Sequence, residues 1–168
     1  MEHSHTIGDI YQGGIIFWLD VSSAHGLIAS RLDQSEESIW GGMNLFISAL
    51  GDDVYAGNLN TTKAVAKLID QNFASLAAAN YKVKSDGLTA CDLISSTEEC
   101  YGDWYLPSRF ELNLMYEQKL VIGGFSDSYY WSSTELNDVN AWGQYFGNGE
   151  TRSFSKNSMF RIRPIRSF

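Results

Sequence analysis

Proline, cysteine, histidine and long apolar runs are all scarce in this sequence. Among its 168 residues there are two Pro, two Cys and three His. The longest apolar runs, such as Gly14 to Leu19, fall far short of the roughly 20 residues that a membrane-spanning helix needs. The N-terminal stretch has no basic region followed by an apolar run, so it is not a signal peptide as written. We therefore expect no membrane insertion, and a chain that is soluble or was cut from a longer one.

The few histidines and cysteines leave little material for catalysis or metal binding. A Ser-His-Asp triad needs a base, but His3 and His5 lie in a predicted tail, and His25 precedes a strand in a turn where a structural role is expected. Zinc needs four clustered ligands, which Cys91, Cys100 and one histidine do not supply. The two cysteines either close a disulfide or stay reduced. We find no phosphate-binding loop, and we expect no enzyme, no cofactor and no metal ion.

Positive charge is scarce before the last strand. Residues 1–150 hold seven Lys and Arg against all 20 Asp and Glu, a net charge of −13, whereas residues 151–168 hold five basic residues and no acidic one. This distribution opposes general nucleic-acid binding, which needs a broad basic face. The basic residues either pair with carboxylates of the body or bind an anionic ligand; they are Arg152, Lys156, Arg161, Arg163 and Arg166.

Apolar spacing predicts a β hairpin and then a long helix. Residues 13–20 and 25–33 form two β segments around the polar turn "VSSA". Residues 60–81 carry an apolar stripe at steps of three and four, with Asn60 or Thr61 as the cap, which predicts a helix. The stripe consists of Ala64, Val65, Leu68, Ile69, Phe73, Leu76 and Ala77.

A second helix and a series of short strands complete the predicted order. Ser108 and Glu111 form a capping box at the start of a helix over 106–119. From residue 123 onward, apolar pulses every 8 to 12 residues predict a meander, with the hairpin turn "GNG" at 147–149 and a break at Pro164. The composition supports one domain with a real core. We predict an α+β fold with helices segregated from an antiparallel sheet.

Several motifs occur in a recognisable order: "IGDIYQGGIIFWLD", "HGLIA", "DWYLPSRFEL", "YWSSTE" and a closing "RIRPIR". Together they resemble a bacterial and phage domain family typified by the C-terminal domain of a collagen-like adhesin, a branch of the C-type-lectin-like fold. The resemblance covers residues 7–168 and implies one ligand-binding domain after a disordered tail, 1–6. It implies twisted antiparallel sheets, two flanking helices, and paired N- and C-terminal strands, with "RIRPIR" closing against "GGIIFWL".

The same resemblance implies that many conspicuous residues are structural framework. These are Trp104, Leu106, Pro107, Trp131, Ser132, Ser133, Trp142 and Phe146. It also implies that three arginines of the closing strand form structural ion pairs, namely Arg161, Arg163 and Arg166.

A narrower similarity concerns the C-terminal third. "YWSSTE", "AW" with Phe four residues on, and "RxRxxR" are similar to the variable proteins of diversity-generating retroelements, in which a reverse transcriptase rewrites positions on a ligand-binding face. By that pattern the exchangeable, ligand-binding positions are Leu136, Asn137, Asp138, Val139, Asn140, Gly143, Tyr145, Asn148, Glu150, Arg152, Phe154, Asn157, Met159 and Phe160. Aromatic residues mixed with Ser and Asn are also typical of antibody paratopes.

These observations together predict a non-catalytic receptor or adhesin domain. Its ligand is a protein or glycan on a cell surface, and its location is a phage tail, a bacterial surface or the secreted fraction. The Glu-Pro-Asn and Gln-Pro-Asp tripeptides of calcium-dependent lectins are absent, which argues against sugar chelation by calcium. Two alternatives remain: a sulfated-polysaccharide adhesin that uses Arg152 and Lys156, and an enzyme of the formylglycine-forming type that uses Cys91 and Cys100. The sequence carries no signal for the oligomeric state.

Overall fold

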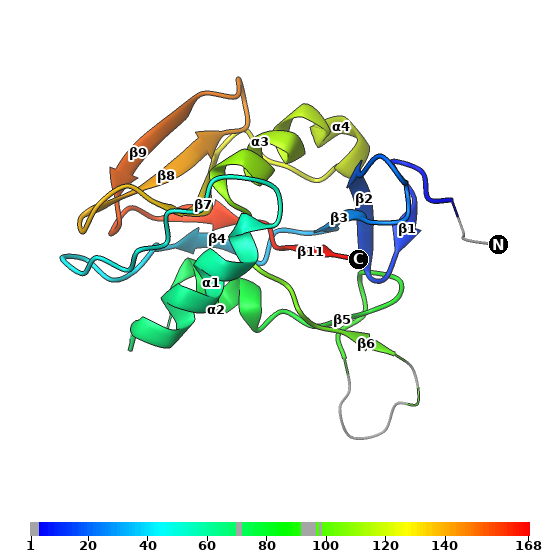
Figure 1. Ribbon diagram of the computed structural model, residues 1–168, viewed down its shortest axis with the longest axis horizontal. Helices are drawn as coiled ribbons and strands as arrows, with labels where there is room; N and C mark the ends of the chain where they lie inside the picture. Colours follow the sequence, from blue (N-terminus) through cyan, green and yellow to red (C-terminus); the bar gives the residue numbers. More distant parts are fainter. Residues whose placement is uncertain (1–3, 70–71, 92–96, 98) are drawn as a thin grey trace.

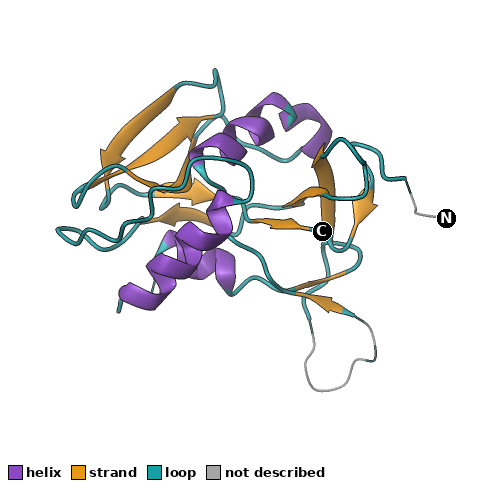
Figure 2. Cartoon of the chain, in the orientation of Figure 1, coloured by secondary structure: helices purple, strands orange, loops and turns teal. Residues whose placement is uncertain are grey.

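Short strands dominate the computed structural model, which describes residues 4–69, 72–91, 97 and 99–168 (Figure 1). The strands are β1 (Ile10–Tyr11), β2 (Gly14–Leu19), β3 (Gly26–Ser30), β4 (Ser35–Ser38), β5 (Val83–Lys84), β6 (Cys100–Tyr101), β7 (Tyr129–Glu135), β8 (Asn140–Tyr145), β9 (Thr151–Ser155), β10 (Phe160–Ile162) and β11 (Ile165–Ser167). The helices are α1 (Ala56–Lys67), α2 (Ala74–Ala79), α3 (Arg109–Glu117) and α4 (Lys119–Ile122). They gather in two groups with the larger sheets between them (Figure 2). None of the helices in the described part of the chain has the length and apolar character needed to span a bilayer.

The strands form a four-stranded sheet in the order β1-β2-β3-β11, a five-stranded sheet in the order β4-β10-β7-β8-β9, and the small pair β5-β6. The predicted first hairpin is confirmed as β2 and β3, and the predicted C-terminal meander as β7, β8 and β9. The fold is mixed α and β, as expected. One pairing differs: β10 lies parallel to β7, so the larger sheet is not purely antiparallel.

The closing segment joins the two larger sheets. Strand β10 pairs with β4, and after the predicted break at Pro164 strand β11 pairs with β3. The prediction that "RIRPIR" pairs with "GGIIFWL" is therefore wrong, because β3 lies between them in the sheet. First and last strands share this sheet without being neighbours. Hydrogen bonding along β3 uses both of its edges, which places it in the middle of the sheet.

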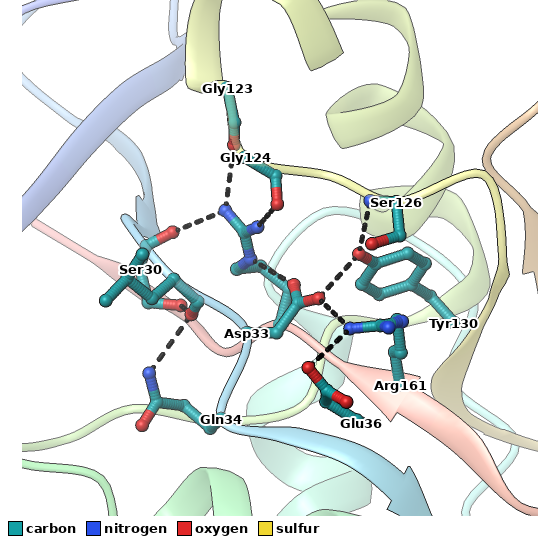
Figure 3. A network of polar contacts seen from close by, with 11 residues as sticks. Ser30, Asp33, Gln34, Glu36, Gly123, Gly124, Ser126, Tyr130 and Arg161 are labelled. Carbon is teal, nitrogen blue, oxygen red and sulfur yellow. Dashed lines mark hydrogen bonds and ion pairs between the residues drawn. The ribbon is translucent and has the colours of Figure 1, made fainter.

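The predicted structural ion pairs of the three arginines are confirmed. Asp33 lies at the junction between the sheets and accepts bonds from Arg163 Nε at 2.7 Å and Arg161 Nη1 at 3.2 Å (Figure 3). Tyr130 Oη donates to the same carboxylate at 2.8 Å. Burial, more than the neighbouring Asp33, raises the pKa of Tyr130 to about 12, so its hydroxyl keeps the proton that it donates. Arg166 pairs with Asp103, at 3.8 Å.

The two ends of the described chain lie together. The ring of His5 lies 4.4 Å from that of Tyr11 and 4.9 Å from that of Phe168. The amide of Thr6 donates to the Asp9 carboxylate. Within the expected tail 1–6, His5 and Thr6 thus contact the domain; residues 1–3 lie outside the described residues, and the disorder of the tail stays a prediction.

The predicted helix over 60–81 is instead two helices. The backbone becomes extended at Leu68, with φ −85° and ψ 133°, and Ile69 is 96% exposed instead of facing the core. This break allows Leu68 and Phe73 to pack closely over Gly41, where an added Cβ would lie within 2.8 Å of Phe73. Val65 is also exposed, at 36%. Residues 70–71 of the predicted helix lie outside the described residues.

Asn60 and Thr61 do not cap the first helix, because α1 begins at Ala56 and both residues are buried inside it. Their side chains serve neighbouring loops. Asn60 exchanges two hydrogen bonds with the backbone of Gly51, and Thr61 Oγ1 accepts from the amide of Leu106 at 3.0 Å. Asn60 therefore binds the loop just before α1, and Thr61 binds the segment that precedes α3.

The capping box of the second predicted helix is confirmed. Ser108 Oγ accepts from the Glu111 amide, and Glu111 accepts from the Ser108 amide. The buried Glu111 carboxylate also accepts from the amides of Tyr55 and Gly57 and from the Tyr105 hydroxyl. Burial raises the pKa of Glu111 even though these bonds oppose the shift. The cap of α3 thus fixes the start of α1 as well.

Strand β7 contributes to two cores because neighbouring side chains point to opposite faces of a sheet. Tyr130 packs in a cluster with Leu112 and Met115 of α3. Trp131 packs in another with Ala64 of α1 and Ala74 of α2. The two helix groups therefore cover opposite faces of the same strand.

Cys91 and Cys100 form a disulfide, with 5.8 Å between their Cα atoms. The bond closes a short loop next to β5 and β6. By loop entropy, the Cys91→Ser/Cys100→Ser variant is expected to lose about 2 to 3 kcal/mol of unfolding free energy, measured by urea denaturation. Dithiothreitol should destabilise the wild type equally and the variant not at all. Unchanged stability of the variant would contradict a contribution from this bond.

Candidate functional site

One side of the five-stranded sheet carries a cluster of partly exposed aromatic rings. We call this cluster the aromatic face; its members are Tyr129, Tyr145, Phe154 and Phe160. Tyr129 lies at its centre, with ring centroids 4.8 to 5.1 Å from the other three. Phe154 and Phe160 rest on the buried cluster around Trp131, so the rings are fixed from below.

The strand register explains why these rings meet. Tyr129 is opposite Tyr145 in β7 and β8, and side chains two residues apart share a face. Gly143, two residues before Tyr145, is opposite Trp131 and is buried. A Cβ there would lie 3.4 Å from the Phe160 ring and 3.2 Å from a backbone oxygen. Gly143, predicted as a ligand contact, therefore supports Phe160 from beneath.

A cavity of about 440 Å³ opens over the edge of the aromatic face. It lies where β7 and β10 begin and where β8 ends. Its lining consists of Glu36, Glu37, Asp127, Ser128, Tyr129, Tyr145, Met159, Phe160 and Arg161. The site thus combines an aromatic floor with a largely acidic rim.

The remaining predicted positions lie in turns at the ends of the strands. Residues 136–139 connect β7 to β8, and Asn137 Oδ1 accepts from the amides of Val139 and Asn140. Asn148 Oδ1 accepts from the Glu150 amide in the turn between β8 and β9. Leu136, Asp138, Asn148, Glu150 and Asn157 are exposed. The side chains of Asn137 and Asn148 therefore shape turns as well as lying at the surface.

For Lys156 the structure confirms pairing with a carboxylate of the body and contradicts the alternative of a basic binding surface. It is fully buried, and its Nζ lies 2.7 Å from Glu135 Oε1 and 2.8 Å from the Leu45 carbonyl oxygen. Arg152 is exposed, with Nη2 2.6 Å from Glu150 Oε1. A sulfated polysaccharide therefore has no access to Lys156, because the lysine is buried and pairs with the buried Glu135 carboxylate.

The residues predicted as framework are buried, with one exception. Trp142 is half-buried on the sheet face opposite the aromatic face, and the guanidinium of Arg109 stacks on its ring at 4.4 Å. His25, for which a structural role was expected, lies in the turn before β3 and is exposed. Cys91 and Cys100 are oxidised to a disulfide, which leaves no free thiol among the cysteines. Across the described ranges, no group of three or more His, Cys, Asp or Glu side chains is placed to hold a metal ion.

No protein-family model matches the chain, and no curated protein matches it significantly.

Several residues of the site lay outside the predicted set. Tyr129 was hidden in the run "YYW", in which its neighbours are core residues. Glu36 and Glu37 reach the site only because β4 pairs with β10. Asp127 is carried there by the start of β7. The run of aromatic residues is a sequence signal for the floor of the site, whereas no sequence pattern indicates the acidic rim.

Proposed function

We propose that this chain is a non-catalytic ligand-binding domain of the C-type-lectin-like fold. Its ligand is a protein or glycan on a cell surface, recognised by the aromatic face and the adjacent turns. The observation that carries the proposal is the convergence of Tyr145, Phe154, Met159 and Phe160, all predicted contacts, around Tyr129 on one partly exposed surface. Rigid aromatic rings surrounded by Ser and Asn are effective in recognition because they lose little entropy on binding. The domain would act on a phage tail, on a bacterial surface or as a secreted protein.

The proposal includes diversification of this surface by a retroelement. The exposed predicted positions are interspersed with buried residues such as Ala141 and Phe146, so substitutions at the exposed positions would leave the core intact. Sequencing this gene from many related genomes should show substitutions concentrated at the predicted positions. An even spread over the chain would contradict diversification.

Cell binding tests the function directly. Biotinylated domain on fluorescent streptavidin would be applied to a panel of intact bacterial strains and measured by flow cytometry. The Tyr145→Ser/Met159→Ser variant is expected to bind about fivefold to tenfold more weakly than the wild type, because it removes two anchors from the surface. Protease and periodate treatment of the cells would then distinguish a protein ligand from a glycan.

A matched control removes exposed apolar side chains elsewhere. Val21 and Leu120 are both strongly exposed, outside the aromatic face, and Val21→Ser/Leu120→Ser should bind like the wild type. Circular dichroism would establish that both variants are folded. Equal loss in the two variants, or no binding to any strain, would contradict the proposal.

A further inference from the structure

The cavity over the aromatic face carries excess negative charge. Its lining contains three carboxylates, Glu36, Glu37 and Asp127, against one guanidinium, Arg161. Arg161 Nη1 lies 3.5 Å from Glu36 Oε1, so these two charges offset each other. Glu37 and Asp127 are exposed, and neither forms an ion pair with any described residue. Two carboxylates on the rim therefore lack a cation.

Arg161 is not free to supply that missing cation. It lies only 3.2 Å from Asp33 Oδ2, and its side chain is 22% exposed. Burial lowers its pKa, but the hydrogen bond to Asp33 and the charges of Asp33 and Glu36 outweigh this and raise it. The guanidinium is thus committed to the junction between the sheets.

The floor of the cavity also favours a cation. The rings of Tyr129 and Phe160 are stacked, with 5.1 Å between centroids and 28° between planes, and Tyr145 adjoins Tyr129 at 5.1 Å. The face of an aromatic ring is its negative side, which attracts a nearby ammonium or guanidinium group. Ring faces and carboxylates therefore select the same sign of charge.

We propose that this cavity binds a basic side chain of a protein partner, with arginine preferred. The inference rests on the proposed function and specifies its ligand. A guanidinium is planar, so it stacks on the Tyr129 ring while its N–H groups pair with carboxylates such as Glu37 and Asp127. A cavity of about 440 Å³ has ample room for one such side chain. A sulfated or otherwise anionic ligand would instead meet two unpaired carboxylates.

The test uses short peptides as probes. The peptide acetyl-Gly-Gly-Arg-Gly-Gly-amide would be titrated into the protein while the ring resonances of Tyr129 and Tyr145 are followed by NMR. Its citrulline version has nearly the same shape without the charge. The arginine peptide is expected to bind about fivefold more tightly than the citrulline peptide, with the lysine peptide between them. Tetramethylammonium and a sulfated heparin disaccharide complete the set.

Variants locate the effect at the rim. Glu37→Gln/Asp127→Asn should abolish most of the preference for arginine over citrulline. The control Glu117→Gln/Asp53→Asn makes the same change in charge at exposed carboxylates outside the cavity and should preserve the preference. Tighter binding of the heparin disaccharide at Tyr129 and Tyr145, equal binding of arginine and citrulline, or no shifts at millimolar peptide would overturn the inference. Tighter binding of tetramethylammonium than of the arginine peptide would overturn it in favour of a small quaternary amine.

Failure of this inference is distinguishable from failure of the proposed function. If the wild type binds cells more tightly than Tyr145→Ser/Met159→Ser but the arginine peptide does not bind, the proposed ligand class is wrong. The proposed function as a binding domain is then still supported. If cells do not bind either, both proposals fail.

Discussion

Replacing Arg163 with methionine is expected to remove about 3 to 5 kcal/mol from the free energy of unfolding, because the change leaves three carbonyl oxygens without their donor and the largely buried Asp33 carboxylate with Arg161 as its remaining cation. The Arg163 side chain is fully buried, and its Nε donates to Asp33 Oδ1 at 2.7 Å. Its other nitrogens donate to the carbonyl oxygens of Ser30, Gly123 and Gly124. One side chain therefore connects β3, the end of α4 and the closing segment.

Urea denaturation and thermal melting would measure this loss, and a fall in melting temperature of about 10 °C is expected for a chain of this size. Arg163→Lys should recover part of the stability, since a lysine keeps the charge but not the planar fork that also stacks on Phe125 at 4.1 Å. Arg152→Met is the matched control at an exposed ion pair and should leave the melting temperature almost unchanged. A similar small effect in Arg163→Met would contradict the structural role.

Lys156→Met is expected to cost a similar amount, about 3 to 5 kcal/mol, because Glu135 would be left buried and charged. Both side chains are fully buried. Glu135 also accepts from the amides of Ile47 and Ala49, so it holds the loop that follows Trp40. Faster hydrogen exchange at Ile47 and Ala49 should accompany the loss of stability.

The double variant Lys156→Met/Glu135→Gln separates charge pairing from packing. It removes both charges and keeps an acceptor for the loop amides, so its loss should be smaller than the sum of the two single losses by at least about 1 kcal/mol. Denaturation of all four proteins gives this coupling energy. Additive losses would show that the two charges do not stabilise each other.

Local patterns in the sequence predicted the parts of the fold that depend on local physics. Alternation and turn residues identified β2, β3 and the strands of the C-terminal meander, and the pair Ser108 and Glu111 identified the start of α3. Long-range packing decided the rest. The helix breaks at Leu68 because two glycines distant in sequence accept its side chain. A short stretch of sequence cannot predict such a contact, because its two partners lie far apart in the chain.

The candidate site is likewise predictable only in the parts that depend on local sequence patterns. Its aromatic floor was visible in the composition of the C-terminal third, because alternating residues on three strands share a face. For Lys156 the sequence leaves both carboxylate pairing and anion binding open, and the structure confirms the pairing; the choice cannot be made locally, because its partner Glu135 lies on another strand. The acidic rim depends on the pairing of β4 with β10, which brings Glu37 beside residues from the far end of the chain.

The neighbouring termini determine where a protein fused to this domain would lie. The rings of His5 and Phe168 are 4.9 Å apart, and the C-terminus lies beside β1 and β2, on the side of the molecule away from β8 and β9 (Figure 1). A partner protein fused to the C-terminus would therefore leave β8 and β9 uncovered. A short linker could join the two ends, and a circularly permuted chain could open at the exposed turn around Val21. Because the two ends are neighbours, the aromatic face would have a similar position relative to a partner protein fused at either end.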